Sequence, residues 1–260
     1  EYIAQCPSCN TELIRKEGDA KHYCPNADNC PPQIKGKFEH FISRKAMNID
    51  GLGGETIELL IQEGLIREIS DLYHLKKEDL LPLERMAEKS VDNLLLGIEQ
   101  SKQIPFERVL FALGIRYVGE TVSKVLCKHF KTIEAIHTAD FETLVAVDEV
   151  GDKIAESVVL HFSQQKNMVL IAALKESRLQ FVSAIADTTK SDKLKGMKIV
   201  VSGVFSQFSR VGLKKMIEEH GGKNVSSISK NTTFVLAGDN IGPSKKQKAE
   251  DLKVAIITEE

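Results

Sequence analysis

Four three-residue segments recur down the middle of the chain, each between two stretches whose apolar residues have helical spacing. The segments are Gly51-Leu52-Gly53, Arg85-Met86-Ala87, Tyr117-Val118-Gly119 and Glu149-Val150-Gly151. Their third residues are 34, 32 and 32 positions apart, and a period in this range is typical of a repeated helical unit. The sequence therefore predicts four helix–hairpin–helix units, with second helices over 54–63, 87–101, 119–130 and 151–163.

Glycine ends three of the four segments and stands directly before the second helix. Such a turn presents free backbone N–H groups at the positive end of a helix dipole, where a phosphate can be held. In the second unit Ala87 replaces glycine and Glu84 and Glu88 flank the turn, so we assign that unit to packing. The alternative for the other three is that glycine only supplies a positive φ for a tight turn.

The predicted phosphate contacts lie at these turns or at the start of the helices that follow them. Contacts to phosphate fix the register of a protein on nucleic acid without reading the bases. The sequence therefore predicts recognition of nucleic-acid shape rather than base sequence. The predicted residues are Gly51, Gly53, Gly54, Thr56, Arg116, Gly119, Thr121, Lys124, Gly151 and Lys153.

The charge of the chain is distributed unevenly. Residues 1–45, 46–189 and 190–260 carry net charges of +1, −8 and +5, although the whole chain carries only −2. A middle region at −8 excludes nucleic-acid binding through bulk charge, so any such binding must be local. Residues 101–131 are the exception, with six basic residues against Glu107 and Glu120.

Four of the five cysteines form two close pairs near the start of the chain, Cys6 with Cys9 and Cys24 with Cys30. Such pairs in an intracellular protein favour zinc over disulfides, and four thiolates complete a tetrahedral shell. The expected site is therefore structural, and prolines that include Pro31 and Pro32 are expected to break up the segment. The alternative is a redox-active Cys-x-x-Cys pair.

A polar linker is expected over 183–193, followed by a unit with the order βαββαβ and a parallel-rich sheet. Its strands are predicted at 198–203, 225–228, 233–237 and 254–257, and its helices at 209–220 and 245–252. Ser202, Gly203, Arg210 and Lys245 are a possible phosphate site in this unit. The alternative is that Gly203 only makes a turn and that the lysines form a solvated face.

Several of these motifs together resemble bacterial NAD-dependent DNA ligases. The resemblance covers the cysteine quartet, residues 43–53, Leu83-Glu84-Arg85-Met86 and residues 113–120, with Ala87 as a departure. Residues 190–260 resemble the BRCT domain of that family. The resemblance implies a multidomain chain with a four-cysteine zinc finger (1–35), an all-α helix-hairpin-helix domain (36–182), a linker (183–193) and an α/β BRCT domain (194–260) whose C-terminal helix is truncated.

The resemblance also implies a function, the sealing of nicks in duplex DNA during replication and repair. The family's catalytic lysine lies in a Lys-x-Asp-Gly motif that this sequence lacks. The chain is thus expected to be the DNA-clamping C-terminal portion, without catalytic residues and inactive alone. It would bind zinc, while NAD and magnesium would bind elsewhere in the parent enzyme. Nicked double-stranded DNA is the expected partner of a monomer in the bacterial cytoplasm, away from membranes.

Two other classes of protein remain open at this point. In one, the chain is a scaffold module whose BRCT unit binds a phosphorylated or protein partner. In the other, it is a fragment of a DNA-repair nuclease, although no acidic cluster with metal-binding spacing supports that reading.

Overall fold

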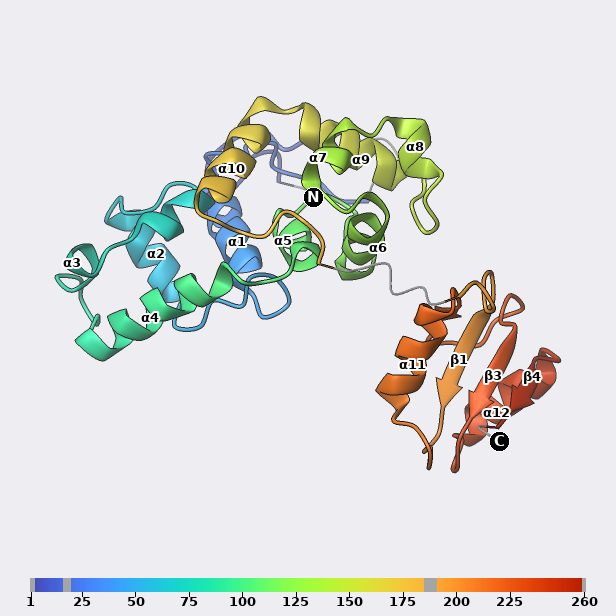
Figure 1. Ribbon diagram of the computed structural model, residues 1–260. Coiled ribbons are helices and arrows are strands. Elements are labelled where there is room, and N and C mark those ends of the chain that lie inside the picture. The colour runs from blue at the N-terminus through green and yellow to red at the C-terminus, as the bar shows by residue number, and fades with distance from the viewer. Residues whose placement is uncertain (1–2, 16–19, 185–190, 259–260) are drawn as a thin grey trace. The chain divides into compact units, whose positions relative to one another are not determined.

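The computed structural model describes residues 3–15, 20–184 and 191–258. It divides into two compact units, residues 1–184 and 185–260 (Figure 1). The central part of the expected linker, residues 185–190, lies outside the described residues. On either side of it, the backbone N–H of Ser183 donates to Lys131 within the first unit, and that of Ser191 donates to Glu219 within the second.

The first unit begins with the cysteine-containing segment, which runs directly into helix α1 (Pro31–Ile42). Two antiparallel bridges, Gln5 with Glu12 and Ile14 with Tyr23, fold the segment back on itself. Pro31 and Pro32 occupy the first two positions of α1, where a missing N–H costs nothing and the fixed φ suits a helix. The cysteine segment contains no helix in its described residues, as its prolines predict, and Pro31 and Pro32 begin the helix that follows it.

All four predicted second helices are confirmed to within one residue at each end. They are α2 (Gly54–Gln62), α4 (Glu88–Ser101), α6 (Glu120–Phe130) and α9 (Asp152–Ser163). The helices that precede the hairpins are α1, α3 (Lys77–Leu80), α5 (Phe106–Ala112) and α8 (Phe141–Val145). The unit also contains η1 (Ile69–His74), α7 (Ile133–Thr138) and α10 (Gln165–Glu176), of which α7 and α10 were not predicted.

One continuous hydrophobic core runs through this unit from Phe38 to Phe181. The residue four positions after each hairpin's third residue is fully buried in every repeat. Its backbone N–H also donates to the carbonyl of that third residue, which makes the first hydrogen bond of the second helix. The 32–34-residue period is therefore the spacing between the points at which successive second helices first contact the core. The four residues are Ile57, Val91, Ser123 and Ala155.

The second unit has the predicted order βαββαβ, and its four strands are all parallel. They pair in the order β2-β1-β3-β4. Helix α11 packs against Ile199 and Val201 on one face of β1, while Val200 lies in the core on the other face with Ala249 of α12. The elements are β1 (Lys198–Ser202), α11 (Arg210–Glu219), β2 (Lys223–Asn224), β3 (Phe234–Ala237), α12 (Pro243–Asp251) and β4 (Ala255–Ile257).

One predicted strand is misplaced, because β2 covers 223–224 rather than 225–228. The apolar residues that suggested the strand are used differently. Val225 still donates its N–H to Ile199, but Ile228 packs into the core from a loop. Burial alone therefore explains the apolar run. Throughout the described ranges, each helix is too short or too polar to cross a membrane.

Candidate functional site

The four cysteines of the first segment converge as a metal-binding cluster. The sulfur atoms of Cys6, Cys9, Cys24 and Cys30 all lie within 4.8 Å of one another. The Cys6–Cys30 and Cys9–Cys24 sulfur pairs are 3.9 and 3.5 Å apart. A tetrahedral site with zinc–sulfur bonds of about 2.3 Å has edges of about 3.8 Å, so the donor set fits zinc. With all four positions filled by thiolates, the ion would hold the fold and leave no place for a substrate.

Hydrogen bonds prepare one of these thiols for ionisation. Contacts with the side chain and backbone of Thr11 lower the pKa of Cys9 to about 6. Desolvation instead raises the pKa of Cys24 to about 12, so the neutral form of that thiol is favoured until a cation is present. Because zinc binds thiolates, loading of the cluster should release protons.

The four hairpins share one backbone conformation, and its unusual residue is the first of each triple. Gly51, Arg85, Tyr117 and Glu149 have φ values of +81, +64, +65 and +70°. Three of them are not glycine, so the positive φ that the turn needs is met by ordinary side chains at some conformational cost. The apolar second residue points into the protein and is buried in the first, third and fourth hairpins.

The glycine at the third position of a hairpin is required neither by its φ nor by crowding around it. Gly53, Gly119 and Gly151 have φ values of −115, −87 and −90°, which any residue adopts. A Cβ at any of the three would meet nothing within 4 Å. The alternative that these glycines supply a positive φ is therefore wrong for them. Gly51 is different, because it has φ +81° and lies against the backbone of Leu94 in α4.

Each third residue is also the N-cap of its second helix. No side chain caps α2, α4, α6 or α9, so the backbone N–H groups of their first turns remain available to an outside acceptor. Helices α7, α8 and α11 are instead capped by the side chains of Thr132, Asp140 and Ser209. Exposed N–H groups and an open glycine together make a surface that a phosphate oxygen can approach closely.

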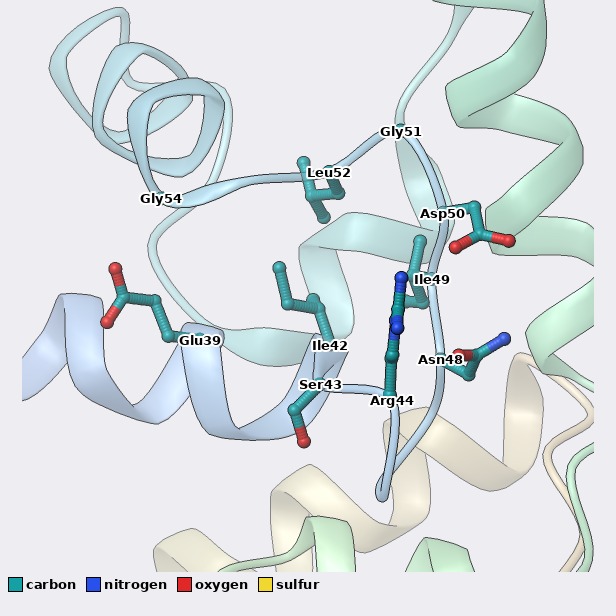
Figure 2. A pocket seen from close by; sticks show the side chains of 10 residues that line it. All are labelled: Glu39, Ile42, Ser43, Arg44, Asn48, Ile49, Asp50, Gly51, Leu52 and Gly54. Atoms are coloured by element: carbon teal, nitrogen blue, oxygen red, sulfur yellow. The ribbon is translucent and has the colours of Figure 1, made fainter.

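The first hairpin borders a shallow hollow of about 380 Å³ that contains acidic side chains. Figure 2 shows Glu39 pointing from α1 toward Gly54, and a Cβ on Gly54 would lie 2.5 Å from its carboxylate oxygen. Asp50 stands on the hairpin itself, while Arg44 lies on the same hollow. Thr56, in the first turn of α2, is half-buried. The first hairpin thus has the right backbone but a mixed charge.

The third hairpin is where basic side chains gather. A hollow of about 330 Å³ beside the start of α6 is lined by four basic residues, Arg44, Lys45, Arg108 and Lys124, and by two acidic ones, Glu107 and Glu120. Lys45 pairs with Glu120 at 2.8 Å and lowers the pKa of that carboxyl group, so the one acidic residue in the first turn of α6 is neutralised.

Two arginines complete the surroundings of the third hairpin. Arg108 donates hydrogen bonds to the carbonyls of Arg44 and Lys45 and thereby fixes the loop before the first hairpin. Arg116 stacks its guanidinium 4.9 Å from the ring centroid of Tyr117 and 5.9 Å from that of Tyr23 in the cysteine segment. Thr121 and Lys124 are exposed on the first turns of α6.

The fourth hairpin has the same backbone and the opposite charge. Asp148, Glu149 and Asp152 surround Gly151, and Lys153 is the one basic residue of the turn. The argument that assigned the second hairpin to packing therefore applies here as well. Gly151 and Lys153 remain predicted contacts, but weaker ones than Gly119 and Lys124.

The predicted phosphate site of the second unit has contacts that explain its residues without a ligand. Gly203 has φ +106°, and a Cβ there would lie 2.6 Å from the carbonyl oxygen of Gly238. Arg210 donates a hydrogen bond to the carbonyl of Val201 at 3.0 Å. Ser202 is buried at the end of β1, and Lys245 is half-buried in the first turn of α12. These contacts favour the structural alternative for Gly203 and Arg210.

Sequence reasoning missed Tyr23, Tyr117, Lys45 and Arg108 as parts of this surface. Arg108 was counted in the basic stretch 101–131, but its partners lie more than 60 positions earlier in the chain. Nothing in the sequence pairs Tyr23 with Arg116, since the two meet only through the docking of the cysteine segment.

Comparison with known proteins matches three regions of the chain to family models. Residues 5–31 match the NAD-dependent DNA ligase C4 zinc finger domain, residues 108–171 the helix-hairpin-helix motif, and residues 189–260 the BRCA1 C Terminus (BRCT) domain. The first match agrees with the four-sulfur cluster, and the second covers the third and fourth hairpins. These modules define a multidomain chain that combines a metal-stabilised finger with helical hairpins and a parallel α/β domain.

Curated relatives agree with these matches along the full length of the chain. Proteins named DNA ligase from Phocaeicola vulgatus, Christiangramia forsetii and Bacteroides fragilis are 55, 58 and 54% identical to it over 261 residues. The alignments cover the whole of this chain but 39% of each relative, so the chain spans well under half their length. Over its whole length the chain is therefore similar to a part of these DNA ligases, and its first module matches a domain of the NAD-dependent ones.

Proposed function

We propose that this chain is the C-terminal, DNA-binding portion of an NAD-dependent DNA ligase, and that its hairpins clamp the backbone of a nicked duplex. The observation that carries the proposal is the open glycine at the third hairpin. Gly119 needs neither its φ nor its lack of a side chain for folding, and it leaves open space through which a partner can approach the turn.

The partner that fits this turn is an anion with several acceptor oxygens. The first turn of α6 offers uncapped N–H groups at the positive end of the helix dipole. Arg116 and Lys124 are exposed beside it, and Lys45 neutralises Glu120. Such contacts recognise the phosphates of a duplex, so binding should be indifferent to base sequence.

The modules would divide the work of the clamp. The finger (1–35) holds zinc, the hairpins of 36–182 grip phosphates, and the linker (183–193) leads to the BRCT domain (194–260). Sealing of nicks in replication and repair would use NAD and magnesium in other domains of the enzyme, so this portion alone would be inactive. The enzyme would act as a monomer in the bacterial cytoplasm.

A binding experiment with a fluorescent duplex tests the proposal. Affinity for nicked and intact duplexes of unrelated sequence should exceed affinity for single strands. With two or three phosphates neutralised, the slope of log K against log salt should be about −2 to −3. Lys124→Gln should weaken binding and make the slope shallower, whereas Lys89→Gln, the same substitution in the first turn of α4 at the second hairpin, should alter neither. Salt-independent binding, or equal binding of single strands, would overturn the proposal.

A further inference from the structure

The exposed cluster of Tyr23, Arg116 and Tyr117 joins the zinc finger to the third hairpin. We propose that Tyr23 is a positioning residue that holds the Arg116 guanidinium toward DNA phosphate, so that the finger sets the strength of the hairpin's grip. This inference rests on the proposed function, since it concerns how the same surface binds DNA.

The geometry places one cation beside two aromatic rings from different parts of the chain. The Arg116 guanidinium carbon lies 5.9 Å from the Tyr23 ring centroid and 4.9 Å from that of Tyr117. Both distances are in the range where a guanidinium is attracted to the face of a ring. Throughout the described part of the chain, no carboxylate forms an ion pair with Arg116, so its charge is left for an outside anion.

The finger holds its own ring in place through backbone contacts. Tyr23 and Ile14 exchange two hydrogen bonds of 2.8 Å in the bridge that folds the finger. One residue later, Cys24 enters the sulfur cluster. The position of the Tyr23 ring therefore depends on the fold of the finger rather than on the hairpin.

A separate set of contacts ties the finger to the helices of the unit. Asp28, between the last two cysteines, accepts hydrogen bonds from Lys166 of α10 at 2.8 Å and from Lys37 of α1 at 3.1 Å. Because α10 lies more than 130 positions away, this carboxylate docks the finger on the helical region. The ring of Tyr23 thus reaches Arg116 as part of a docked module.

The other hairpins show that this arrangement is specific to the third. The residue that precedes the positive-φ position is Asp50, Glu84 or Asp148 in the first, second and fourth hairpins, and Arg116 in the third. An arginine on a solvated turn loses side-chain entropy when a phosphate orders it. A guanidinium that is already held by two rings loses less side-chain entropy on binding. The contact with the finger should therefore raise the affinity for DNA.

A double-mutant cycle on duplex affinity tests the inference. Tyr23→Leu removes the ring, and Tyr23→Phe is the matched control that keeps it. We expect Tyr23→Leu to weaken duplex binding about two- to fivefold and Tyr23→Phe to leave it unchanged. In an Arg116→Met background, Tyr23→Leu should have no further effect. Bound zinc and the melting temperature, measured on each variant, should stay at the wild-type values.

The outcomes separate this inference from the proposed function. If Tyr23→Leu leaves affinity unchanged, or weakens it equally in the Arg116→Met background, the positioning role is overturned while duplex binding stands. If the wild type itself does not prefer duplex DNA, the proposed function fails first. Should Tyr23→Leu lose zinc, Arg116→Lys supplies the second test. The inference expects weaker binding from Arg116→Lys, because an ammonium does not stack as a planar guanidinium does, and unchanged binding would overturn it.

Discussion

The third and fourth hairpins have the same backbone and opposite surroundings. Tyr117 and Glu149 both have a positive φ, and Gly119 and Gly151 have φ values within 3° of each other, with open space where a Cβ would be. The third hairpin is flanked by Arg116, whereas the fourth carries three carboxylates. The shape of the turn is therefore set by the core beneath it, and we expect charge to decide which turn holds a phosphate.

Zinc removal should have the largest effect, and it should destabilise the third hairpin more than the fourth. Structural zinc contributes on the order of 10 kcal/mol to the folding of such fingers. We expect a chelator to abolish protection of the Tyr23 amide in hydrogen exchange and to raise exchange at the third hairpin more than at the fourth. The β1–β3 amides of the second unit should stay protected. Equal changes at both hairpins would contradict a specific link between the finger and the third.

The second largest effect is expected from a carboxylate added to a hairpin, which should lower duplex affinity much more at the third hairpin than at the fourth. Gly119→Asp repels phosphate and obstructs its hydrogen bonds to backbone N–H groups, so duplex affinity should fall roughly 10- to 100-fold. Gly151→Asp adds the same charge to a turn that is already acidic, and should lower affinity about twofold or less. Melting curves control for folding. Equal losses at the two positions would show that the fourth hairpin also grips DNA.

Charge reversal at the fourth hairpin tests whether a basic residue there increases duplex affinity. Asp148→Arg places a basic residue where the third hairpin has Arg116, and should strengthen duplex binding about two- to threefold with a steeper salt slope. Asp148→Asn removes the carboxylate without adding a cation and should have a smaller effect. Unchanged affinity in both variants would mean that the fourth hairpin lies away from the DNA.

The smallest expected effect is a dependence of stability on pH through Glu120. The hydrogen bond from Lys45 lowers the pKa of this carboxyl group in the folded state. The ion pair therefore stabilises the folded protein at pH values above the ordinary pKa of glutamate, about 4.3. This stabilisation is lost as the pH falls through the lower pKa that Glu120 has in the folded protein. Wild type and Glu120→Gln should thus converge in melting temperature in acid. Both side chains are substantially exposed, so salt should screen the difference at neutral pH.

Local patterns in the sequence predicted the elements and the metal cluster. Helical spacing and hairpin period placed α2, α4, α6 and α9 within one residue, and four cysteines close in sequence could only meet in one small segment. The apolar run at 225–228 was predicted to be a strand, and this was wrong because Ile228 is buried in a loop of the second unit.

Long-range contacts account for most of what the sequence did not reveal. Tyr23 meets Arg116 across 93 positions, and Arg108 reaches the loop before the first hairpin. The alternative explanation of the third-position glycines was a positive φ, but Arg85, Tyr117 and Glu149 take that conformation. The sequence also could not show the open space beside Gly53, Gly119 and Gly151, which depends on the folded surroundings of each turn.

Gly119→Ala gives the most direct measurement of the central claim, that the glycine serves the partner and not the fold. Its φ of −87° and the empty space around it allow a methyl group without strain. We predict a change in stability of at most about 1 kcal/mol, because alanine restricts the unfolded chain but is a poorer N-cap than glycine. Duplex affinity should fall in the same protein, while Gly151→Ala should change it little. A Gly119→Ala variant destabilised by clearly more than this, or a stable one with full affinity, would contradict the account.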